Sequence, residues 1–304
     1  MAKNLIPVVS FSINFNTLSI NMNAKHDDID DRLVWLLKRF ELKAHIFKTG
    51  PLRHPGNFQA QYNLGYIHVL KSGKLLLETA GKPAQRLEEP SIFFYMNSTK
   101  HRLTPEDDNV NLVCASFEFG ANLKNPLTQA LPDMLVLRQQ DMPTLTKSLN
   151  LLFKEAEENH CGRQAILDRQ IEIVIILLLR DLMDENRLNI GLLAGLADMK
   201  LAKAINAMHA EPEKHWSLEE LAAKAGMSRA RFANNFRTTV GITPGHYLTE
   251  WRLGIARSLL SRGKTVQLVA DTIGYSNASA LSRVFITHMG VSPSAWRKKY
   301  LADN

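Results

Sequence analysis

The stretch that decides the fold is SLEELAAKAGMSRARFANNFRTTVGITP, residues 217–244, which returns as TVQLVADTIGYSNASALSRVFITHMGVSP, residues 265–293. Gly226 of the first copy corresponds to Gly274 of the second at an offset of 48 residues. Beyond the turn the offset is 49 residues, as the proline that ends each copy indicates. The C-terminal part of the chain is therefore an internal repeat with one residue inserted after the turn.

Each copy has the pattern of two short helices joined by a tight turn. In the first copy Ser217 and Glu220 are spaced as a capping box, and Gly226 stands where a left-handed residue ends the helix. Ser228 then caps a second helix, whose inward face carries Phe232. The pattern predicts a helix-turn-helix unit, which places its second helix in the major groove of DNA.

A further helix is expected after each copy, because Thr243-Pro244 and Ser292-Pro293 each pair an N-cap residue with a first-turn proline. The helix from Pro244 to about Ser261 would hold two recognition helices for successive major grooves about 34 Å apart. A plain helical bundle with a solvated basic face is the alternative interpretation. The duplication favours DNA binding over it.

Charge is distributed unevenly along the 304 residues, whose formal net charge is +7. Residues 1–195 hold 22 Lys and Arg against 22 Asp and Glu, whereas residues 196–304 hold 15 against 8. The whole basic excess thus lies in the block that contains the repeat. This asymmetry indicates one neutral module and one module with a polyanionic partner, either nucleic acid or an anionic membrane surface.

The cysteines and the apolar runs exclude several classes of protein. Cys114 and Cys161 cannot form a disulfide framework, and no C-x-x-C pair offers a zinc or thioredoxin-type site. The longest wholly apolar run, Ile173 to Leu179, is far shorter than the ~20 residues that span a bilayer. No signal-peptide pattern is found. We therefore expect a soluble cytoplasmic protein with no membrane partner.

Between Ala44 and Leu137 the sequence has the pattern of an all-β module, which follows a short helix expected at about residues 31–40. Short apolar runs are separated by turn signals, which lie at residues 48–51, 71–74, 80–83 and 104–108. Many short strands at this spacing are typical of a sandwich or barrel.

Helical periodicity takes over at residues 141–185, where a helix from about Ala165 to Met183 is apolar on nearly every side between Ile171 and Leu182. Such a helix is buried in a core or in a homodimer interface, and the sequence leaves both open. We predict a multidomain α+β chain in four parts: an extension (1–29), a β-barrel or sandwich (30–140), a helical connector (141–195) and an all-α DNA-binding domain (196–304).

Residues 200–300 resemble the tandem helix-turn-helix domain of the AraC/XylS family of transcription regulators. The matching segments are SLEELAAKAGMSRARF, TPGHYLTEWRLGIARSLL, VADTIGYS and SRVFITHMGVSPSAWRKKY. The resemblance implies that one monomer reads two adjacent major-groove segments of double-stranded DNA, usually upstream of a promoter, and contacts RNA polymerase there. Activation is the expected mode of regulation.

Carried over position by position, the family's base-reading positions fall on six residues of this chain. They are Ala230, Ala233, Asn234, Ser279, Ala280 and Arg283. Arg283 can make a bidentate contact to guanine, and Asn234 can read adenine or bind a phosphate. The two alanines Ala230 and Ala280 can at most touch a thymine methyl group.

A second set of residues is expected to contact the DNA backbone, which fixes the register without reading sequence. It comprises Arg229, Arg231, Arg237, Arg252, Arg297, Lys298 and Lys299, and Ser228 is counted with the DNA-binding residues. The second copy departs from the family's pattern at Leu281, where an aromatic residue is usual, and at Ile286 and Thr287, where basic residues are common. We therefore expect the first motif and Arg283 to dominate the affinity.

Residues 44–137 are similar to the cupin-type sensor domain that precedes such DNA-binding domains, in the branch that carries a cysteine on a late strand. The matching segments are YIHVLKSGKLLLETAGK, FFYMNSTKHRL and LVCASFEFGANLKNPLTQALPDMLVL. The segment LLAGLADMKLAKAINAMHAEPEKHW, which leads into the first helix-turn-helix in that branch, is present as well. The resemblance implies a domain that senses a small molecule or an oxidant.

His68 and His101 are the candidate effector-binding residues, because they fall where two cupin side chains face each other, with His54 as a third. Cupins often bind a metal through several histidines and a carboxylate. Here the usual His-x-His pair is absent and no acidic residue stands at ligand spacing. Because a divalent site needs three or four protein ligands, we expect barrel residues or donors to an unknown effector and no cofactor, with a metal in the cupin-like domain as the less favoured alternative.

Cys114 lies in an apolar, strand-like run and is either a small buried hydrophobe or an oxidant sensor. The resembling branch includes regulators that respond to reactive chlorine, and such a switch needs an accessible thiol of low pKa. Lys100 and His101 would lower the pKa of this thiol if they lie beside it. Cys161 is the candidate resolving partner.

These observations predict a sequence-specific transcriptional regulator, not an enzyme, whose cupin-like domain controls tandem helix-turn-helix binding at a promoter. The alternative is a cupin-type metal-dependent enzyme or small-molecule-binding protein with an accessory helical domain, but the metal-ligand set is missing. A purely architectural DNA-binding protein would leave the sensor-like module unexplained. A DNA-repair protein of the alkyl-transfer type needs a cysteine cluster, which two cysteines cannot supply.

Overall fold

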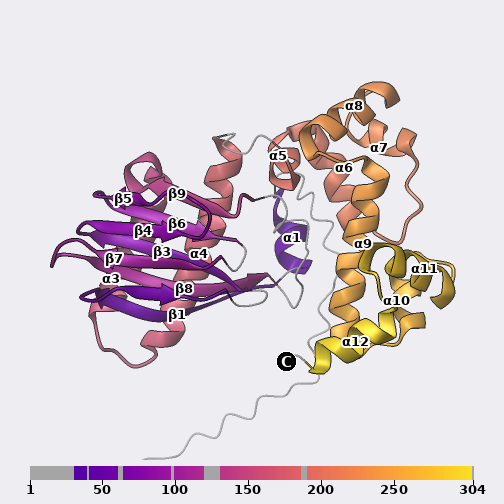
Figure 1. Cartoon of the computed structure of the whole chain (residues 1–304). Helices are drawn as coiled ribbons and strands as arrows, with labels where there is room; N and C mark the ends of the chain where they lie inside the picture. The colour runs from indigo at the N-terminus through magenta and orange to yellow at the C-terminus, as the bar shows by residue number, and fades with distance from the viewer. Residues whose placement is uncertain are drawn as a thin grey trace, which may run out of the picture. The chain divides into compact units, whose positions relative to one another are not determined.

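The computed structural model describes residues 31–39, 41–60, 64–96, 99–119, 131–185 and 190–302. The extension predicted at residues 1–29 lies outside the described residues. A short helix, α1 (Val34–Arg39), precedes the strands, which belong to the N-terminal half, whereas the C-terminal half is helical (Figure 1). The predicted α+β class, with a β module followed by helices, is confirmed.

The β module consists of two antiparallel sheets with a shared core. The first sheet has the strand order β1-β8-β3-β6-β9, with bounds Leu42–Pro51, Asn111–Phe119, Gly65–Ser72, Ser91–Tyr95 and Met134–Arg138. The second has the order β2-β7-β4-β5, with bounds Gly56–Phe58, His101–Pro105, Leu75–Thr79 and Gln85–Leu87. Buried residues of both sheets, among them Leu70, Leu77 and Leu103, form one hydrophobic cluster between them. The predicted sandwich is thus confirmed.

One of the four predicted turns, at residues 48–51, is wrong. These residues continue β1, where Pro51 pairs with Asn111 of β8. A bulge after Ile46 and the left-handed backbone of Gly50, with a φ of 91°, keep the strand on its partner. Pairing with a neighbouring strand therefore outweighs the local turn preference of Gly-Pro. The other three predicted turns follow β3, β4 and β7.

Alternation along β3 gives the first sheet two buried faces. Tyr66 and Leu70 belong to the core between the sheets, whereas Ile67 belongs to a second core that includes the helices behind the sheet. Two short 3₁₀ turns, Gln139–Asp141 and Pro143–Leu145, lead from β9 into these helices, which are α3 (Thr146–Glu157) and α4 (Arg163–Asp184).

The long helix α4 lies against β1 (Figure 1). Its Asp168 carboxylate accepts a hydrogen bond from the backbone N–H of Ile46 at 2.8 Å. Most of the apolar stretch 171–182 is buried within this chain, as one of the two predicted alternatives requires. Ile166 and Ile173, however, are 42% and 50% exposed on the helix.

The C-terminal part contains the two predicted helix-turn-helix motifs. Its helices are α5 (Leu192–Ala197), α6 (Met199–Ala210), α7 (Leu218–Lys224), α8 (Arg229–Val240), α9 (Pro244–Ser261), α10 (Val266–Thr272), α11 (Ala278–Met289) and α12 (Pro293–Ala302). Ser217 and Glu220 form the predicted capping box, and Gly226 and Gly274 adopt φ values of 61° and 78°. Ser228 stands at the N-cap of α8, but its hydroxyl makes no capping hydrogen bond, contrary to the prediction.

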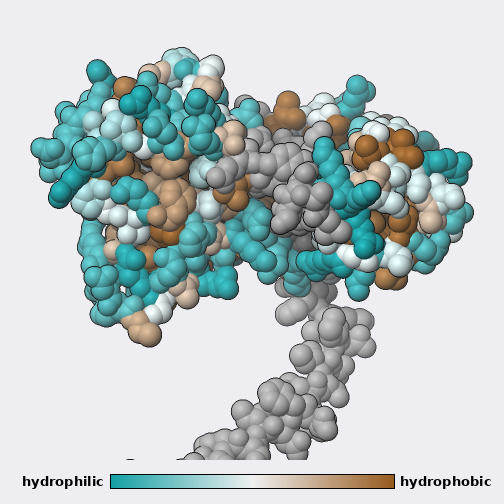
Figure 2. Space-filling view, turned by 60° about the horizontal axis from the view of Figure 1, so that its bottom comes forward, coloured by the Kyte–Doolittle hydropathy of each residue, from teal (hydrophilic) through white to brown (hydrophobic). Residues whose placement is uncertain are grey.

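Helix α9 joins the two motifs and is buried along most of its length. Trp251, Leu253 and Ile255 have no exposed surface. Helices α8, α10 and α12 all contact α9. Within the described residues, no helix combines the length and the apolar character that a membrane span needs. In the view of Figure 2, hydrophilic residues cover most of the visible surface and hydrophobic residues form smaller patches among them.

The two turn glycines provide a matched pair for testing the motif. An alanine Cβ at Gly226 would meet no atom within 4 Å, so Gly226→Ala should cost about 1 kcal/mol of unfolding free energy, from the left-handed backbone alone. The same Cβ at Gly274 would overlap the backbone oxygen of Glu213. Gly274→Ala should therefore cost clearly more in urea unfolding. Equal losses for the two variants would contradict this packing.

Candidate DNA-binding surface and sensor cavity

Helix α8 divides into a buried face and a face free to meet DNA. Phe232, Phe236 and Val240 are buried. The exposed residues are Ser228, Arg229, Ala230, Arg231, Asn234 and Arg237, and Ala233 is half-buried. Helical periodicity puts the apolar residues against α5, α7 and α9, so that Ala230, Asn234 and Arg237 share the opposite face.

The arginines of α8 differ in their surroundings. Arg229 forms an ion pair of 2.9 Å with Glu219 of α7, and both side chains are largely exposed. Within the described part of the chain, Arg231 and Arg237 take part in no ion pair. They are therefore free to neutralise phosphates, which supports their predicted role.

Helix α11 offers fewer charges than α8. Its N-cap, Asn277, accepts a hydrogen bond from the Ala280 N–H at 2.8 Å, which fixes the first turn. Ser279 and Arg283 are exposed and Ala280 is half-buried. The exposed C-terminal half instead presents Ile286, at 47% exposure. Arg283 is thus the one cation that α11 itself contributes.

The phosphate contact predicted for Arg252 is not supported by the structure. This side chain of α9 is buried, and it donates hydrogen bonds to the backbone oxygens of Pro212 at 2.5 Å and Lys214 at 2.9 Å. Burial lowers the pKa of its guanidinium, which Tyr275 partly offsets. Arg252 therefore secures the loop before α7. On α12, Lys298 and Lys299 are exposed and Arg297 is half-buried.

His68 of β3 and His101 of β7 meet between the two sheets, as predicted from their positions. Their Nε2 atoms lie 2.9 Å apart, and both residues are buried. His101 Nδ1 lies 2.7 Å from the carbonyl oxygen of Thr99, to which it donates. In the neutral pair, His101 Nε2 is thus the acceptor and His68 Nε2–H the donor, which leaves the buried His68 Nδ1 without a partner.

Aromatic rings enclose this pair and keep it neutral. Phe58 and Tyr95 stack on the two sides of His101, with ring centroids at 4.8 Å and 4.0 Å. Phe93 stacks on His68 at 5.0 Å. Burial lowers the pKa of His101 to about 4 and the pKa of His68 well below its usual range, the latter also through repulsion by His101.

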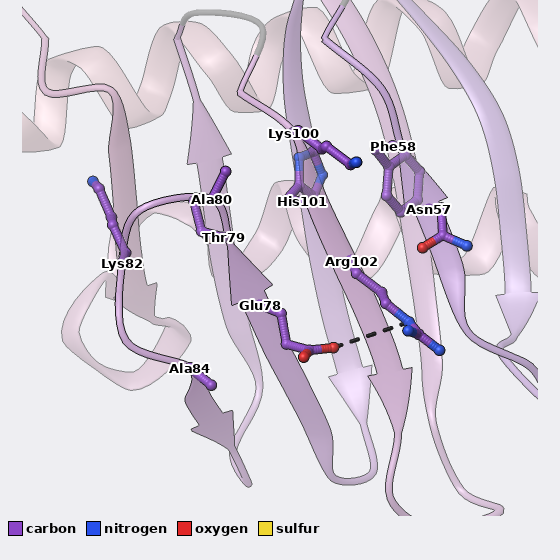
Figure 3. A pocket seen from close by; sticks show the side chains of 10 residues that line it. All are labelled: Asn57, Phe58, Glu78, Thr79, Ala80, Lys82, Ala84, Lys100, His101 and Arg102. Atoms are coloured by element: carbon purple, nitrogen blue, oxygen red, sulfur yellow. Dashed lines mark ion pairs between the residues drawn. The ribbon is translucent and has the colours of Figure 1, made fainter.

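A cavity of about 550 Å³ opens beside His101 (Figure 3). Its lining comes from β2, β4, β7 and the turn after β4, and includes Asn57, Phe58, Glu78, Thr79, Ala80, Lys82, Ala84, Lys100, His101 and Arg102. Arg102 forms a long ion pair of 3.9 Å with Glu78, drawn as a dashed line in Figure 3. Three cations against one carboxylate make the cavity attractive to an anion.

The pair does not fit a cupin metal centre. His54, the predicted third residue, is exposed in the segment before β2. Among the described residues, no His, Cys, Asp or Glu joins His68 and His101 in a group of three potential ligands. Since a divalent site needs three or four protein ligands, two imidazoles in direct hydrogen-bond contact do not supply one.

Cys114 lies beside His68 on the neighbouring strand β8, in the core between the sheets. The thiol is fully buried, and burial raises its pKa, although Lys48 acts in the opposite direction. An oxidant sensor needs an accessible thiolate, which this environment does not provide. Cys161 is exposed in the segment between α3 and α4.

Sequence reasoning missed several of these residues. Lys82, Glu78 and Arg102 line the cavity, yet they lie on separate strands and turns and carry no motif. Only the pairing of β4 with β7 brings Glu78 opposite Arg102. The buried role of Arg252 was equally hidden, because an arginine on an amphipathic helix usually faces solvent.

Two family models match this chain. One, described as Cupin, matches residues 31–184, and the other, described as Helix-turn-helix domain, matches residues 221–299. An uncharacterized HTH-type transcriptional regulator of Haemophilus influenzae is 30% identical over 263 residues, which cover 77% of this chain and 86% of that protein. The HTH-type transcriptional regulator AlkR of Acinetobacter baylyi is 28% identical, covering 87% and 90%. The RCS-specific HTH-type transcriptional activator RclR of Escherichia coli is 27% identical, covering 76% and 84%.

The neutral histidine pair makes the sandwich sensitive to acid. The pKa of folded His101, about 4, lies below the value of 6.5 expected for the unfolded chain, so the unfolded state binds the proton first as the pH falls. Because of His101, the free energy of unfolding should fall by about 3 kcal/mol from pH 7 to pH 4. His68 should lower it further.

The measurement is urea unfolding at several pH values between 7 and 4, monitored by circular dichroism in the β-sheet band. His101→Gln should flatten the pH dependence, whereas His215→Gln, which replaces an exposed histidine outside the sandwich, should leave it unchanged. An identical slope in His101→Gln and the wild type would contradict the assignment.

Proposed function

This chain belongs to the AraC-type transcriptional regulators that carry an N-terminal cupin domain, and on that premise we propose that occupancy of the sandwich cavity controls how α8 and α11 bind DNA. DNA binding by the helix-turn-helix domain follows from the family. The observation that carries the proposal is the coexistence in one chain of an exposed recognition face with the unpaired cations Arg231 and Arg237 and a separate cationic cavity.

DNA recognition by α8 and α11 is assigned from their exposed chemistry. On α8 the unpaired cations Arg231 and Arg237 suit phosphates, and Asn234 suits a base edge or a phosphate. On α11 the exposed Arg283 suits guanine, while Ser279 and Ala280 are close by on the same helix. The first motif therefore supplies most of the affinity and the second supplies specificity at the base pair that Arg283 reads.

The effector is proposed to be a small anion, such as a carboxylate. Lys82, Lys100 and Arg102 line the cavity with a single carboxylate among them, and His101 forms part of its wall. An anion that binds there would contact the same ring whose position depends on His68. Direct sensing of oxidants by Cys114 is not favoured, because its thiol is buried and its pKa is raised.

The remaining partners stay predictions. RNA polymerase is expected from the family's mode of action, and the cytoplasm is the expected site of action. A homodimer would use the face of α4 on which Ile166 and Ile173, seven residues apart, are exposed. The enzyme alternative has lost support, since the residues of the sandwich do not fit a metal centre. No catalytic step is needed for the proposed function.

Two arginine substitutions separate phosphate binding from base reading. Arg231→Ala should weaken binding to all duplexes and lower the salt slope by about 1, whereas Arg283→Ala should cost about 1–3 kcal/mol at one base pair. The operator is first selected from random duplexes at two salt concentrations. Lys264→Ala, which removes an exposed cation of the α9–α10 connection, is the control. If both arginine variants lost the same DNA affinity regardless of sequence, the assignment of Arg231 to a phosphate and Arg283 to a base would be wrong.

Anion binding is tested by thermal shift of the full chain against a panel of small carboxylates and their neutral amides. Acidic compounds should raise the melting temperature and the amides should not, because the cavity carries excess positive charge. Lys82→Ala combined with Lys100→Ala should abolish the shift. Lys74→Ala, in the β3–β4 turn outside the cavity, should preserve it. Shifts that follow the amides equally well would contradict an anionic effector.

A further inference from the structure

Three potential metal ligands converge between α9 and α11, away from the predicted base-reading residues. His246 and Glu250 lie four residues apart on α9, and His288 lies in the last turn of α11. One ligand atom of each lies within 4.8 Å of the others. Within the described ranges, no other three His, Cys, Asp or Glu side chains are grouped in this way.

The three groups lie close enough together to share one metal ion after small side-chain shifts, although Glu250 and His288 also form a hydrogen bond. Glu250 Oε1 lies 2.8 Å from His288 Nδ1 but 3.6 Å from His246 Nε2, which is beyond hydrogen-bond distance. An ion with bonds of 2.0–2.2 Å in tetrahedral geometry separates its ligand atoms by about 3.3 Å, between these two values. The two rings are perpendicular, with centroids 5.7 Å apart, and one nitrogen of each lies within 4.8 Å of the other.

Both helices hold these ligands on rigid backbone. The Thr243 hydroxyl accepts a hydrogen bond from the His246 N–H at 3.4 Å, which closes the first turn of α9. The Gly290 N–H donates to the Ile286 oxygen at 2.8 Å, which closes the last turn of α11 around His288. Because the backbone that carries the ligands is already ordered, no segment of the chain has to fold when the ion binds.

Solvent access is compatible with an ion that enters from water. The side chain of Glu250 is only 18% exposed, and those of His288 and His246 are 24% and 51% exposed. The carboxylate is therefore shielded between the helices, while His246 covers the open side. Two imidazoles and one carboxylate are the donor set that Zn²⁺ accepts, with a fourth position left for water.

We propose that His246, Glu250 and His288 bind one divalent transition-metal ion, with Zn²⁺ as the best chemical match, and that the ion fastens the second recognition helix to α9. The first motif has no equivalent, because Thr239 occupies the position that corresponds to His288. The ion would thus stabilise the motif that carries fewer DNA-binding charges.

The test uses the untagged full chain with Cys161→Ser, which removes the exposed thiol as a competing ligand. After treatment with a chelator, calorimetric titration with Zn²⁺ should give a stoichiometry of one ion per chain. The Zn²⁺-loaded protein should melt several degrees higher than the metal-free protein. Glu250→Gln keeps an oxygen acceptor but removes the charge. Because even the outer partners of ligands are worth about tenfold in metal affinity, Glu250→Gln and His288→Gln should each weaken binding by more than tenfold.

His215→Gln removes an exposed histidine elsewhere and should leave the affinity for Zn²⁺ unchanged. If a variant fails to fold, the test uses NMR spectra of the protein with all its histidines, in which the imidazole signals report Zn²⁺ binding. Zn²⁺ should move the signals of His246 and His288 and leave that of His215. The proposal is overturned if no stoichiometric binding occurs, if the variants bind like the parent, or if the signals of His68 and His101 move instead.

Discussion

The burial of α9 is the constraint on which the DNA-binding half depends. Its Trp251, Leu253, Ile255 and Leu260 are inaccessible to solvent, and α8, α10 and α12 are packed around it. A helix buried along most of its length cannot rotate or slide without opening cavities, and truncating a single large core side chain to alanine already costs about 2–5 kcal/mol. The two recognition helices therefore keep a fixed relation to one helix, which two motifs on a flexible linker would lack.

Burial also determines the protonation states of the titratable groups inside the sandwich. The core between the sheets is apolar apart from a few groups, and desolvation there penalises charge on any of them. His68 and His101 respond by remaining neutral and sharing one hydrogen bond, and Cys114 by remaining a thiol. Beside this core, the cavity carries charged side chains. An anion in that cavity thus meets cations at its rim and a neutral ring in its wall.

Whether a structural feature could be predicted from the sequence depends on whether local or tertiary interactions determine it. Local signals fixed the helical repeat, because caps such as Thr243 and glycines such as Gly274 act within one turn of chain. Tertiary partners decided the rest. Residues 48–51 extend β1 because they pair with β8, and Arg252 is buried because it donates hydrogen bonds to the loop before α7. The cavity was out of reach for the same reason, since its cations meet only through strand pairing.

The two motifs divide their work along the chemistry of their recognition helices. Helix α8 presents unpaired arginines, whereas α11 presents Arg283 and an exposed Ile286. The segment before α5 is hydrogen-bonded to α8, since the Gly191 N–H donates to the Thr239 oxygen at the end of α8. A Cβ at Gly195 of α5 would clash with Val240, the last residue of that helix. A displacement of α5 therefore acts on α8, the helix with the phosphate-binding charges, so regulation through the connector would alter affinity before it alters sequence preference.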